Sequence, residues 1–510
     1  MPEALLVPTG ASGEAASERG RKLSTALNRL QQLREGLTLD GDLRAQGLAG
    51  DGPRRSQGHS GGMQPHAQPP ARFAITAVVP PGLEEPAAAE LQALGALEVR
   101  PLRRAVACRT DLAGFYRLHL RSRLPFRFLR ELARFPCRDR RELRRAVQAA
   151  APWELWLPPE RSFKVEASGS LPELNHSHYT ALEVKNALVD WQRQQWGERS
   201  TVDLRDPDLR LHLHLSPSAG GLAILSLESG GGSGEGGSST PEGAGASSGP
   251  GGSDGGGGGT GVGWQRDGSG GGGSLHRRGY RAAMGLAPLK ENLAAGLIAH
   301  TGWDGSLPLV DPLCGSGTLL LEAAAMALGR APGLIWGEGS GPGAPAAAPR
   351  PRSFGLMRWP DFDAALWSHE VAAAAAERRG TLADGRPLAP ILGLERDPQV
   401  LAQARANAAA AGLAGQLLLQ QGDFRDLVPP PGPGMLVCNP PYGLRLGADD
   451  DLGALYSDLG RMVRERCSGW TLWLLSGNPE LTGALRLKAS RRIAVSNGGL
   501  DCRWLRYEIR

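Results

Sequence analysis

The spacing of apolar residues from position 72 onward predicts a mixture of strands and helices. Residues 72–79 form a mostly apolar run that stops at two prolines, as expected of a strand. Leucines between 209 and 215 alternate with polar residues, which is typical of a strand with one face in water. A further strand is predicted at 162–166, and helices are predicted at about 83–94 and 179–195.

The pattern changes at residue 309 to short, wholly apolar runs, each followed by polar residues. Such runs are typical of parallel strands that are buried on both faces. They are predicted at 309–311, 391–395, 416–420, 435–438 and 471–475, with a closing pair at 491–495 and 503–507. Because helical spacing separates most of the runs, we expect an α/β domain with a seven-stranded sheet whose last strand is reversed.

Glycine, serine and proline are concentrated in two segments that cannot bury enough apolar surface to fold. Residues 1–70 are predicted to be a disordered tail, in which the leucines at 23–37 allow a short helix. Residues 229–274 are predicted to be a Gly/Ser-rich flexible insertion. The folded domains are therefore expected at 71–217 and 275–510, the latter with an Ala/Gly/Pro-rich insertion at about 329–390.

The formal net charge is only +5, but positive charge is concentrated between Arg100 and Arg145. This segment contains fifteen arginines, no lysine and four acidic residues. Such a block favours an anionic partner, in particular a nucleic acid, although a solvated helix face is the alternative.

The six cysteines are scattered without CxxC pairs, which favours buried thiols in a reducing compartment. No apolar run is long enough to span a bilayer and the N-terminus lacks a signal-peptide core, so we expect no membrane association. Four histidines could in principle bind a metal ion, but they lack acidic or cysteine neighbours at the spacing of metal ligands. Two of them also fall on the polar face of a predicted strand. We therefore predict no metal site at His176, His178, His212 and His214.

Residues 309–326 have the pattern of a strand, a tight glycine turn and a helix. The apolar run breaks at Asp311, and Gly315 and Gly317 precede an Ala-rich helical stretch. Glycines there allow close approach of a ligand, and the free amides of a helix N-terminus can bind a carboxylate or phosphate. The turn suits a cofactor with a negative or polar tail, although similar turns also precede helices that bind nothing.

A second motif, Asn439-Pro440-Pro441-Tyr442, follows the predicted strand at 435–438. The carboxyl ends of such strands hold ligands in open α/β sheets, and the prolines leave carbonyl oxygens free to face a substrate. The motif resembles the signature of S-adenosylmethionine-dependent methyltransferases that act on exocyclic amino groups of nucleobases. By this resemblance Asn439 and the Pro440 carbonyl accept the amine N–H groups, and Tyr442 stacks on a flipped base. A Pro-rich loop with a packed tyrosine is the alternative.

Several N-terminal segments resemble the THUMP RNA-binding domain and the segment that leads into it. Together with the second half of the chain, they resemble bacterial large-subunit ribosomal RNA guanine-N2 methyltransferases. This resemblance implies a class I (Rossmann-like) methyltransferase domain behind an N-terminal α+β THUMP domain, with RNA as the partner. The matching segments are 73–77, 81–84, 184–190, 196–199, 207–213, 274–281 and 287–293.

The methyltransferase resemblance also implies S-adenosylmethionine as the cofactor. Glu395 ends the second predicted strand, where an acid accepts hydrogen bonds from ribose hydroxyls, but it lies 84 residues after Asp311 because of the insertion. Asp423 would accept from the adenine amino group, unless it is only a turn residue. Lys290 belongs to a turn that, by resemblance, lines the methionine end. The predicted cofactor-binding residues are Asp311, Gly315, Gly317, Glu395, Asp423 and Lys290.

The predicted function is methylation of the N2 amine of a guanine in RNA, ribosomal RNA above all, with Asn439, Pro440, Pro441 and Tyr442 at the base. A transfer-RNA guanine, an adenine N6 target, and a non-catalytic ribosome-assembly factor are the alternatives. Arg277, Arg278 and Arg281 either clamp phosphates or form a basic linker. We expect a monomer in the bacterial cytoplasm, with a plastid as the alternative location.

Overall fold

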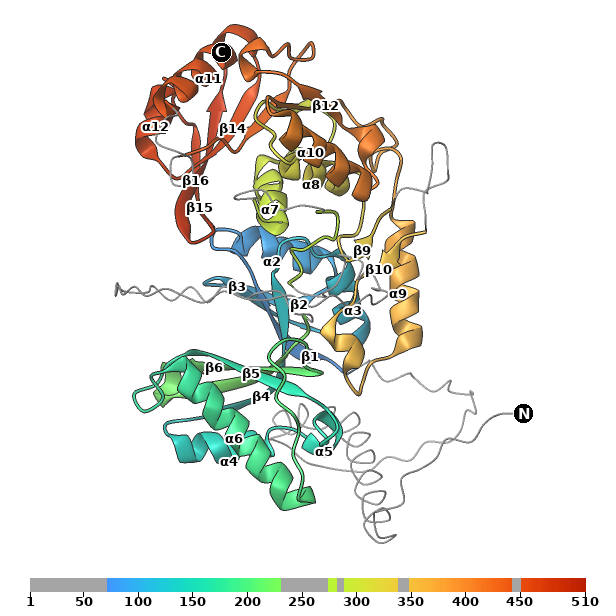
Figure 1. Cartoon of the computed structure of the whole chain (residues 1–510), viewed down its shortest axis with the longest axis vertical. Helices are drawn as coiled ribbons and strands as arrows, with labels where there is room; N and C mark the ends of the chain where they lie inside the picture. Colours follow the sequence, from blue (N-terminus) through green and yellow to red (C-terminus); the bar gives the residue numbers. More distant parts are fainter. Residues whose placement is uncertain (1–70, 231–273, 282–288, 338–347, 443–450) are drawn as a thin grey trace, which may run out of the picture.

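The computed structural model describes residues 71–230, 274–281, 289–337, 348–442 and 451–510. Two seven-stranded sheets follow one another along the long axis of the molecule (Figure 1). The predicted N-terminal tail with its short helix, and nearly all of the Gly/Ser-rich insertion, lie outside the described residues.

The first sheet has the strand order β2-β3-β1-β4-β7-β6-β5 and is formed by the N-terminal part of the chain. β4 and β7 pair antiparallel, with Leu129 opposite Glu228, and so join its two halves. We expected the first domain to end at residue 217, but β7 carries the sheet further, because apolar residues resume after the turn at 218–221. Its strands are β1 (Phe73–Val78), β2 (Leu97–Leu102), β3 (Ala105–Thr110), β4 (Arg127–Pro136), β5 (Phe163–Gly169), β6 (Leu209–Ser216) and β7 (Leu222–Glu228); its helices are α2 (Glu84–Ala93), α3 (Leu112–Arg121), α4 (Arg140–Ala149), α5 (Trp153–Trp156) and α6 (Ser177–Trp196).

The second sheet has the order β12-β11-β8-β13-β14-β16-β15. β16 runs antiparallel to both of its neighbours, while the other pairs are parallel, which confirms the predicted reversed last strand. Its strands are β8 (Leu309–Asp311), β11 (Ile391–Glu395), β12 (Leu418–Gln421), β13 (Met435–Cys438), β14 (Thr471–Ser476), β15 (Arg491–Asn497) and β16 (Leu500–Glu508); the helices are α7 (Glu291–Thr301), α8 (Thr318–Ala327), α10 (Pro398–Ala410), α11 (Leu452–Arg466) and α12 (Pro479–Ala484).

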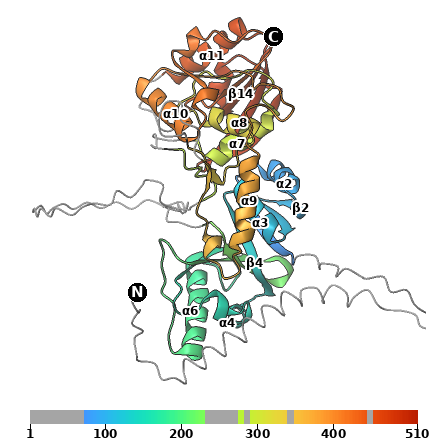
Figure 2. The same ribbon diagram turned by 90° about the vertical axis from the view of Figure 1, so that its right-hand side faces the viewer.

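The insertion after α8 leaves the second sheet and packs on the first domain. Its helix α9 (Ala364–Ala376) lies along α3 (Figure 2). The Trp359 ring stacks on Phe115 with 5.9 Å between ring centres, and the Tyr116 hydroxyl accepts from the Asp363 N–H at 2.8 Å. The insertion therefore fastens the two domains together. Its other elements are β9 (Leu334–Ile335), β10 (Arg350–Pro351) and the 3-10 turn at Gly355–Arg358.

A second contact between the domains depends on two glycines. A Cβ on Gly296 of α7 would come within 2.3 Å of the Leu83 side chain, and one on Gly82 would come within 2.0 Å of the Ala494 carbonyl oxygen in β15. Both distances are far below van der Waals contact, so only glycine permits this approach. The start of α2 is thereby packed against α7 and the edge strand β15 (Figure 1).

Most of the arginine block is neutralised within the protein. Of its fifteen arginines, ten lie within 4.0 Å of an acidic side chain, for example Arg130 with Asp361 at 2.5 Å. Several of these acids belong to the insertion, far along the sequence. The block therefore presents less free positive charge than its composition suggested. Those without an acidic partner in the described part of the chain are Arg100, Arg103, Arg104, Arg141 and Arg145, all exposed.

The cysteines and histidines mostly follow the sequence predictions, with one correction. All six cysteines are buried and free. His214 is exposed as expected, but His212 is buried, because β6 lies inside the sheet and Glu166 of β5 stands opposite it in register. Burial lowers the pKa of His212 to about 4. Within the described ranges, no three metal-ligating side chains come together, and no helix has the length and apolar character needed to cross a membrane.

Candidate active site

The two motifs meet because their strands are parallel neighbours. β8 pairs with β13, with Leu309 opposite Met435 and Val310 opposite Leu436, so Asp311 and Asn439 leave the sheet at the same edge. β11 flanks β8 on the other side and places Glu395 at that edge too. The sequence predicted these strand ends, and the sheet order brings them together, as the ligand crevice of an open α/β sheet requires.

The turn after β8 needs its glycines. Gly315 and Gly317 have φ values of +55° and +81°, a region that side-chain-bearing residues rarely adopt. Gly317 is the N-cap of α8, and a Cβ on Gly315 would meet no atom of the described residues within 4 Å. The Gly315 backbone therefore borders open space at a helix N-terminus, which fits the predicted cofactor turn.

Glu395 supports this turn from the neighbouring strand. One carboxylate oxygen accepts from the Gly315 N–H at 3.2 Å and the other accepts from the Asp397 N–H at 2.9 Å. Oxygens with unused lone pairs can accept further hydrogen bonds, as a ribose would require.

Asp311 is a buried carboxyl group at the same edge. Only 2% of the residue is exposed, and its oxygen accepts from the Leu313 N–H at 3.1 Å. Burial, and secondarily the nearby charge of Glu395, raise the pKa of Asp311 to about 8. A carboxyl group of this kind is unusual away from functional sites.

Two predicted cofactor residues have partners inside the protein. Asp423 caps a 3-10 turn by accepting from the Arg425 N–H at 2.9 Å, and its carboxylate pairs with the Arg425 guanidinium at 2.9 Å. The ammonium nitrogen of Lys290 lies 5.1 Å from the centre of the Phe126 ring. The turn-residue interpretation of Asp423 thus gains a structural basis, while the roles in cofactor binding stay predictions.

The Asn-Pro-Pro-Tyr motif begins where β13 ends. The Asn439 side-chain oxygen is buried and has no hydrogen-bond partner among the described residues. A buried acceptor without a donor is costly, so its retention points to a ligand that supplies one. The Tyr442 hydroxyl accepts from the Asn497 side-chain amide at 2.7 Å. The sequence analysis missed Asn497, since only an Asn-Gly-Gly turn marks its place in the hairpin.

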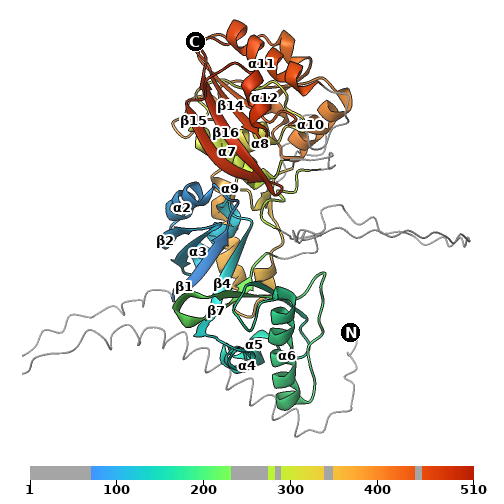
Figure 3. The same ribbon diagram turned by 90° about the vertical axis from the view of Figure 1, so that its left-hand side faces the viewer.

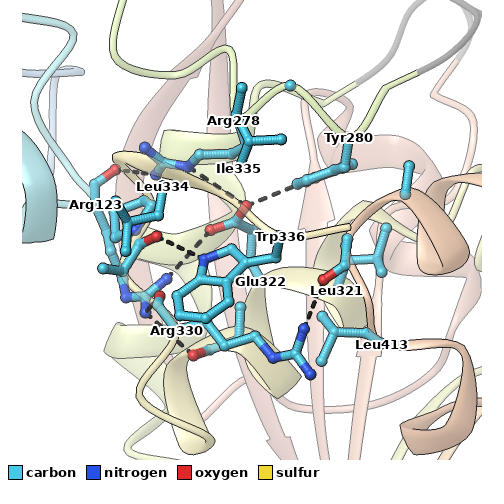
Figure 4. Close-up of a pocket in the computed structure, with 16 residues that line it drawn as sticks. Arg123, Arg278, Tyr280, Leu321, Glu322, Arg330, Leu334, Ile335, Trp336 and Leu413 are labelled. Carbon is cyan, nitrogen blue, oxygen red and sulfur yellow. Dashed lines mark hydrogen bonds and ion pairs between the residues drawn. The ribbon is translucent and has the colours of Figure 1, made fainter. Parts of the chain in front are cut away.

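Arg278 and Arg281, at the start of the second domain, are held by groups of the protein, whereas Arg277 is exposed. Arg278 is 6% exposed, donates to the Leu275 and Arg123 carbonyls, and lies 3.6 Å from the Glu322 carboxylate of α8. Tyr280 donates to the same carboxylate at 3.1 Å (Figure 4). Arg281 pairs with Glu291 at 3.3 Å. The terminal guanidinium nitrogens of Arg278 and Arg281 donate to groups of the protein, which favours a structural role over a phosphate clamp for these two residues.

Replacing Glu322 with glutamine should destabilise the protein by about 3–5 kcal/mol, because it removes the carboxylate that pairs with both Arg278 and Arg123 in a largely buried site. Urea unfolding measures the loss. Glu377→Gln is the matched control: Glu377 pairs with Arg121 but is 47% exposed at the side chain, so about 1 kcal/mol or less is expected. Equal losses in the two variants would contradict the buried role of Glu322.

Comparison with known families identifies the parts of this architecture. Residues 278–506 match the RMKL-like methyltransferase domain, 137–225 match the THUMP domain, and 74–129 match the RlmL ferredoxin-like domain. A Synechocystis protein named as an RNA methyltransferase is 39% identical over 433 residues, which is 85% of this chain and 96% of the relative. The chain belongs to the RMKL-like methyltransferases. The predicted family and fold class are confirmed, and S-adenosylmethionine is the methyl donor that goes with them.

Other relatives of this RMKL-like methyltransferase are longer. The ribosomal RNA large subunit methyltransferase K/L of Syntrophotalea carbinolica is 36% identical, and the alignment covers 86% of this chain but only 54% of that protein. The chain thus spans about half the length of the K/L relative. Among solved structures, a methyltransferase in complex with SAH has a TM-score of 0.65 at 23% identity, covering 86% of this chain and 98% of the other, which supports the fold.

Proposed function

We propose that this RMKL-like methyltransferase methylates the exocyclic N2 amine of a guanine in RNA, with 23S ribosomal RNA in the bacterial cytoplasm as the first candidate. The observation that carries the proposal is the buried Asn439 oxygen, which has no hydrogen-bond partner in the described part of the chain and lies at the same sheet edge as the glycine turn. The RNA methyltransferase name of the Synechocystis relative and the ribosomal RNA name of the K/L relatives support RNA as the substrate class.

The chemistry of the amine explains why an acceptor is needed at this place. The lone pair of an exocyclic amine is delocalised into the base, so the nitrogen is a weak nucleophile. S-adenosylmethionine supplies a methyl group on a positively charged sulfur. The Asn439 oxygen and the Pro440 carbonyl would accept the two N–H groups and favour the pyramidal nitrogen that attacks. Orientation by these acceptors is the main contribution we assign to the protein.

The remaining site residues would position the two reactants. Gly315, Gly317, Glu395 and Asp311 would hold the cofactor along the β8 and β11 ends, and Tyr442 would stack on the base. The Asn497 hydrogen bond fixes one end of the tyrosine side chain. A base must leave its helix to reach such a pocket, which suits an enzyme with a separate THUMP domain.

Nucleoside mass spectrometry tests this proposal. The full chain would be incubated separately with 23S ribosomal RNA and with transfer RNA, both transcribed in vitro, and with S-adenosylmethionine carrying a deuterated methyl group. Labelled N2-methylguanosine is the expected product. Labelled N6-methyladenosine would instead support the adenine alternative and overturn the guanine assignment. No labelled base in either ribosomal or transfer RNA would overturn the enzymatic proposal.

Cofactor binding at pH 7 should release up to about one proton, because Asp311 has a pKa of about 8 and is mostly protonated in the free protein. A positively charged donor bound nearby favours the carboxylate, so affinity should also rise as the pH approaches 8. Calorimetry in buffers of different ionisation enthalpy measures the released protons. Asp311→Asn should lower the release, and an unchanged release would contradict the role of Asp311.

A further inference from the structure

A groove of about 460 Å³ opens at the carboxyl end of β14, beside α12 and the β15–β16 hairpin. These four elements are labelled in Figure 3. Its volume falls within the range of small-ligand sites, roughly 300–1,000 Å³. The loop at 476–479 forms one wall, and residues of β15 and β16 form the other. None of the sequence motifs predicted this groove.

Positive charge is concentrated on the groove. Arg492 of β15 stands opposite Leu505, and Arg503 of β16 stands opposite Ala494, so both side chains project from the same face of the hairpin. Both line the groove and both are exposed. Within the described ranges, neither has an acidic side chain within ion-pair distance, and Asp501 is the only acidic residue on the groove wall.

The segment leading into β15 extends this charge. Between Arg486 and Arg492 there are four basic residues and no acidic one. Arg486 and Lys488 are exposed, and the residues that follow each of them, Leu487 and Ala489, line the groove. Of these four basic residues only Arg492 lines the groove, and the others add positive charge to the surface beside it, which favours a polyanion as partner.

Gly477, at the end of β14, lies between the groove and the proposed base site. Gly477 lines the groove, and a Cβ at Gly477 would lie 3.4 Å from a ring carbon of Tyr442. Tyr442 is in turn held by Asn497, whose side chain is on the opposite face of the β15–β16 hairpin from Arg492 and Arg503. A nucleotide chain with its target base at Tyr442 would therefore have to pass around the end of β14 at Gly477 to reach the groove on the other face.

We propose that this groove binds the phosphates of single-stranded RNA next to the target nucleotide, with Arg492 and Arg503 as the phosphate contacts. The inference rests on the proposed function and extends it from the target base to the flanking backbone. Guanidinium groups match phosphate oxygens in geometry and charge. Such contacts fix the register of the RNA without reading its sequence. Arg492 and Arg503 are thus positioning residues.

The salt dependence of RNA binding tests the proposal directly. Each phosphate contact to a single strand contributes about −0.7 to the slope of log K against log salt concentration. The double variant Arg492→Ala/Arg503→Ala should therefore reduce the slope for a fluorescent oligouridylate by about 1.4. Lysines at both positions should keep most of the slope. Arg405→Ala is the control, because Arg405 is an exposed cation on α10, away from the groove, and should leave the slope unchanged.

Two further readouts separate this inference from the proposed function. Calorimetric titration with S-adenosylmethionine should be unaffected in the double variant, and its KM for ribosomal RNA should rise more than its kcat falls. A wild-type slope in the double variant would overturn the groove assignment even if N2-methylguanosine is made. A reduced slope in a protein that labels no RNA would uphold the groove and overturn the proposed reaction.

Discussion

Asn439→Ala should lower kcat by about 10²–10³-fold while leaving the Kd for S-adenosylmethionine essentially unchanged. The variant removes the buried oxygen that has no partner in the described structure and that we assign to the amine. An interaction made mainly in the transition state affects turnover and leaves ground-state binding intact. Single-turnover transfer to ribosomal RNA, together with calorimetry of the cofactor, measures both quantities.

Asn439→Asp is the matched control, because it keeps an acceptor oxygen at the same position. It should retain more activity than the alanine variant. If the alanine variant transfers methyl groups at the wild-type rate, Asn439 does not orient the amine. If the alanine variant loses both activity and cofactor binding, Asn439 has a structural role. The proposed separation of the cofactor site from the site of the base would then be wrong.

Glu395→Ala should affect cofactor binding more than turnover, in contrast to Asn439→Ala. We expect the affinity for the cofactor to fall by about 10–100-fold and kcat at saturating cofactor to change much less. Two effects contribute to the loss. The proposed ribose hydrogen bonds disappear, and the N–H groups of Gly315 and Asp397 lose the acceptor that shapes the turn. Calorimetric titration measures the affinity.

Glu395→Gln separates these two effects. Glutamine keeps one acceptor oxygen but replaces the other with an N–H donor, which would face a backbone N–H. We expect an affinity between those of the wild type and the alanine variant. An alanine variant that binds S-adenosylmethionine as tightly as the wild type would exclude Glu395 from the cofactor site.

The local parts of the site could be predicted because short sequence patterns encode them. A strand, two glycines and a helix follow one another within 18 residues, and Asn439 directly follows an apolar run. The structure places β8 next to β13, so the glycine turn and Asn439 lie at the same edge of the sheet, as the sequence analysis predicted. The distance of 84 residues between Asp311 and Glu395 weakened the sequence argument, but the insertion leaves the sheet and does not disturb the pairing of β8 with β11.

Interactions across long sequence distances could not be predicted. The arginine block suggested RNA binding, yet acids such as Asp361 and Glu370 in the insertion neutralise part of it. The strands and helices of that block were also missed, since frequent arginines obscure the apolar spacing. The cations at Arg492 and Arg503 are separated in sequence and become one surface only when the hairpin pairs.

A crystal structure of the full chain with S-adenosylhomocysteine would test the shared site most directly. We predict that the ligand lies across the carboxyl ends of β8 and β11, with its ribose at Glu395 and its sulfur facing the Asn439 side chain. A ligand bound elsewhere, or with its sulfur turned away from Asn439, would contradict the proposal that one chamber brings the methyl donor and the amine together.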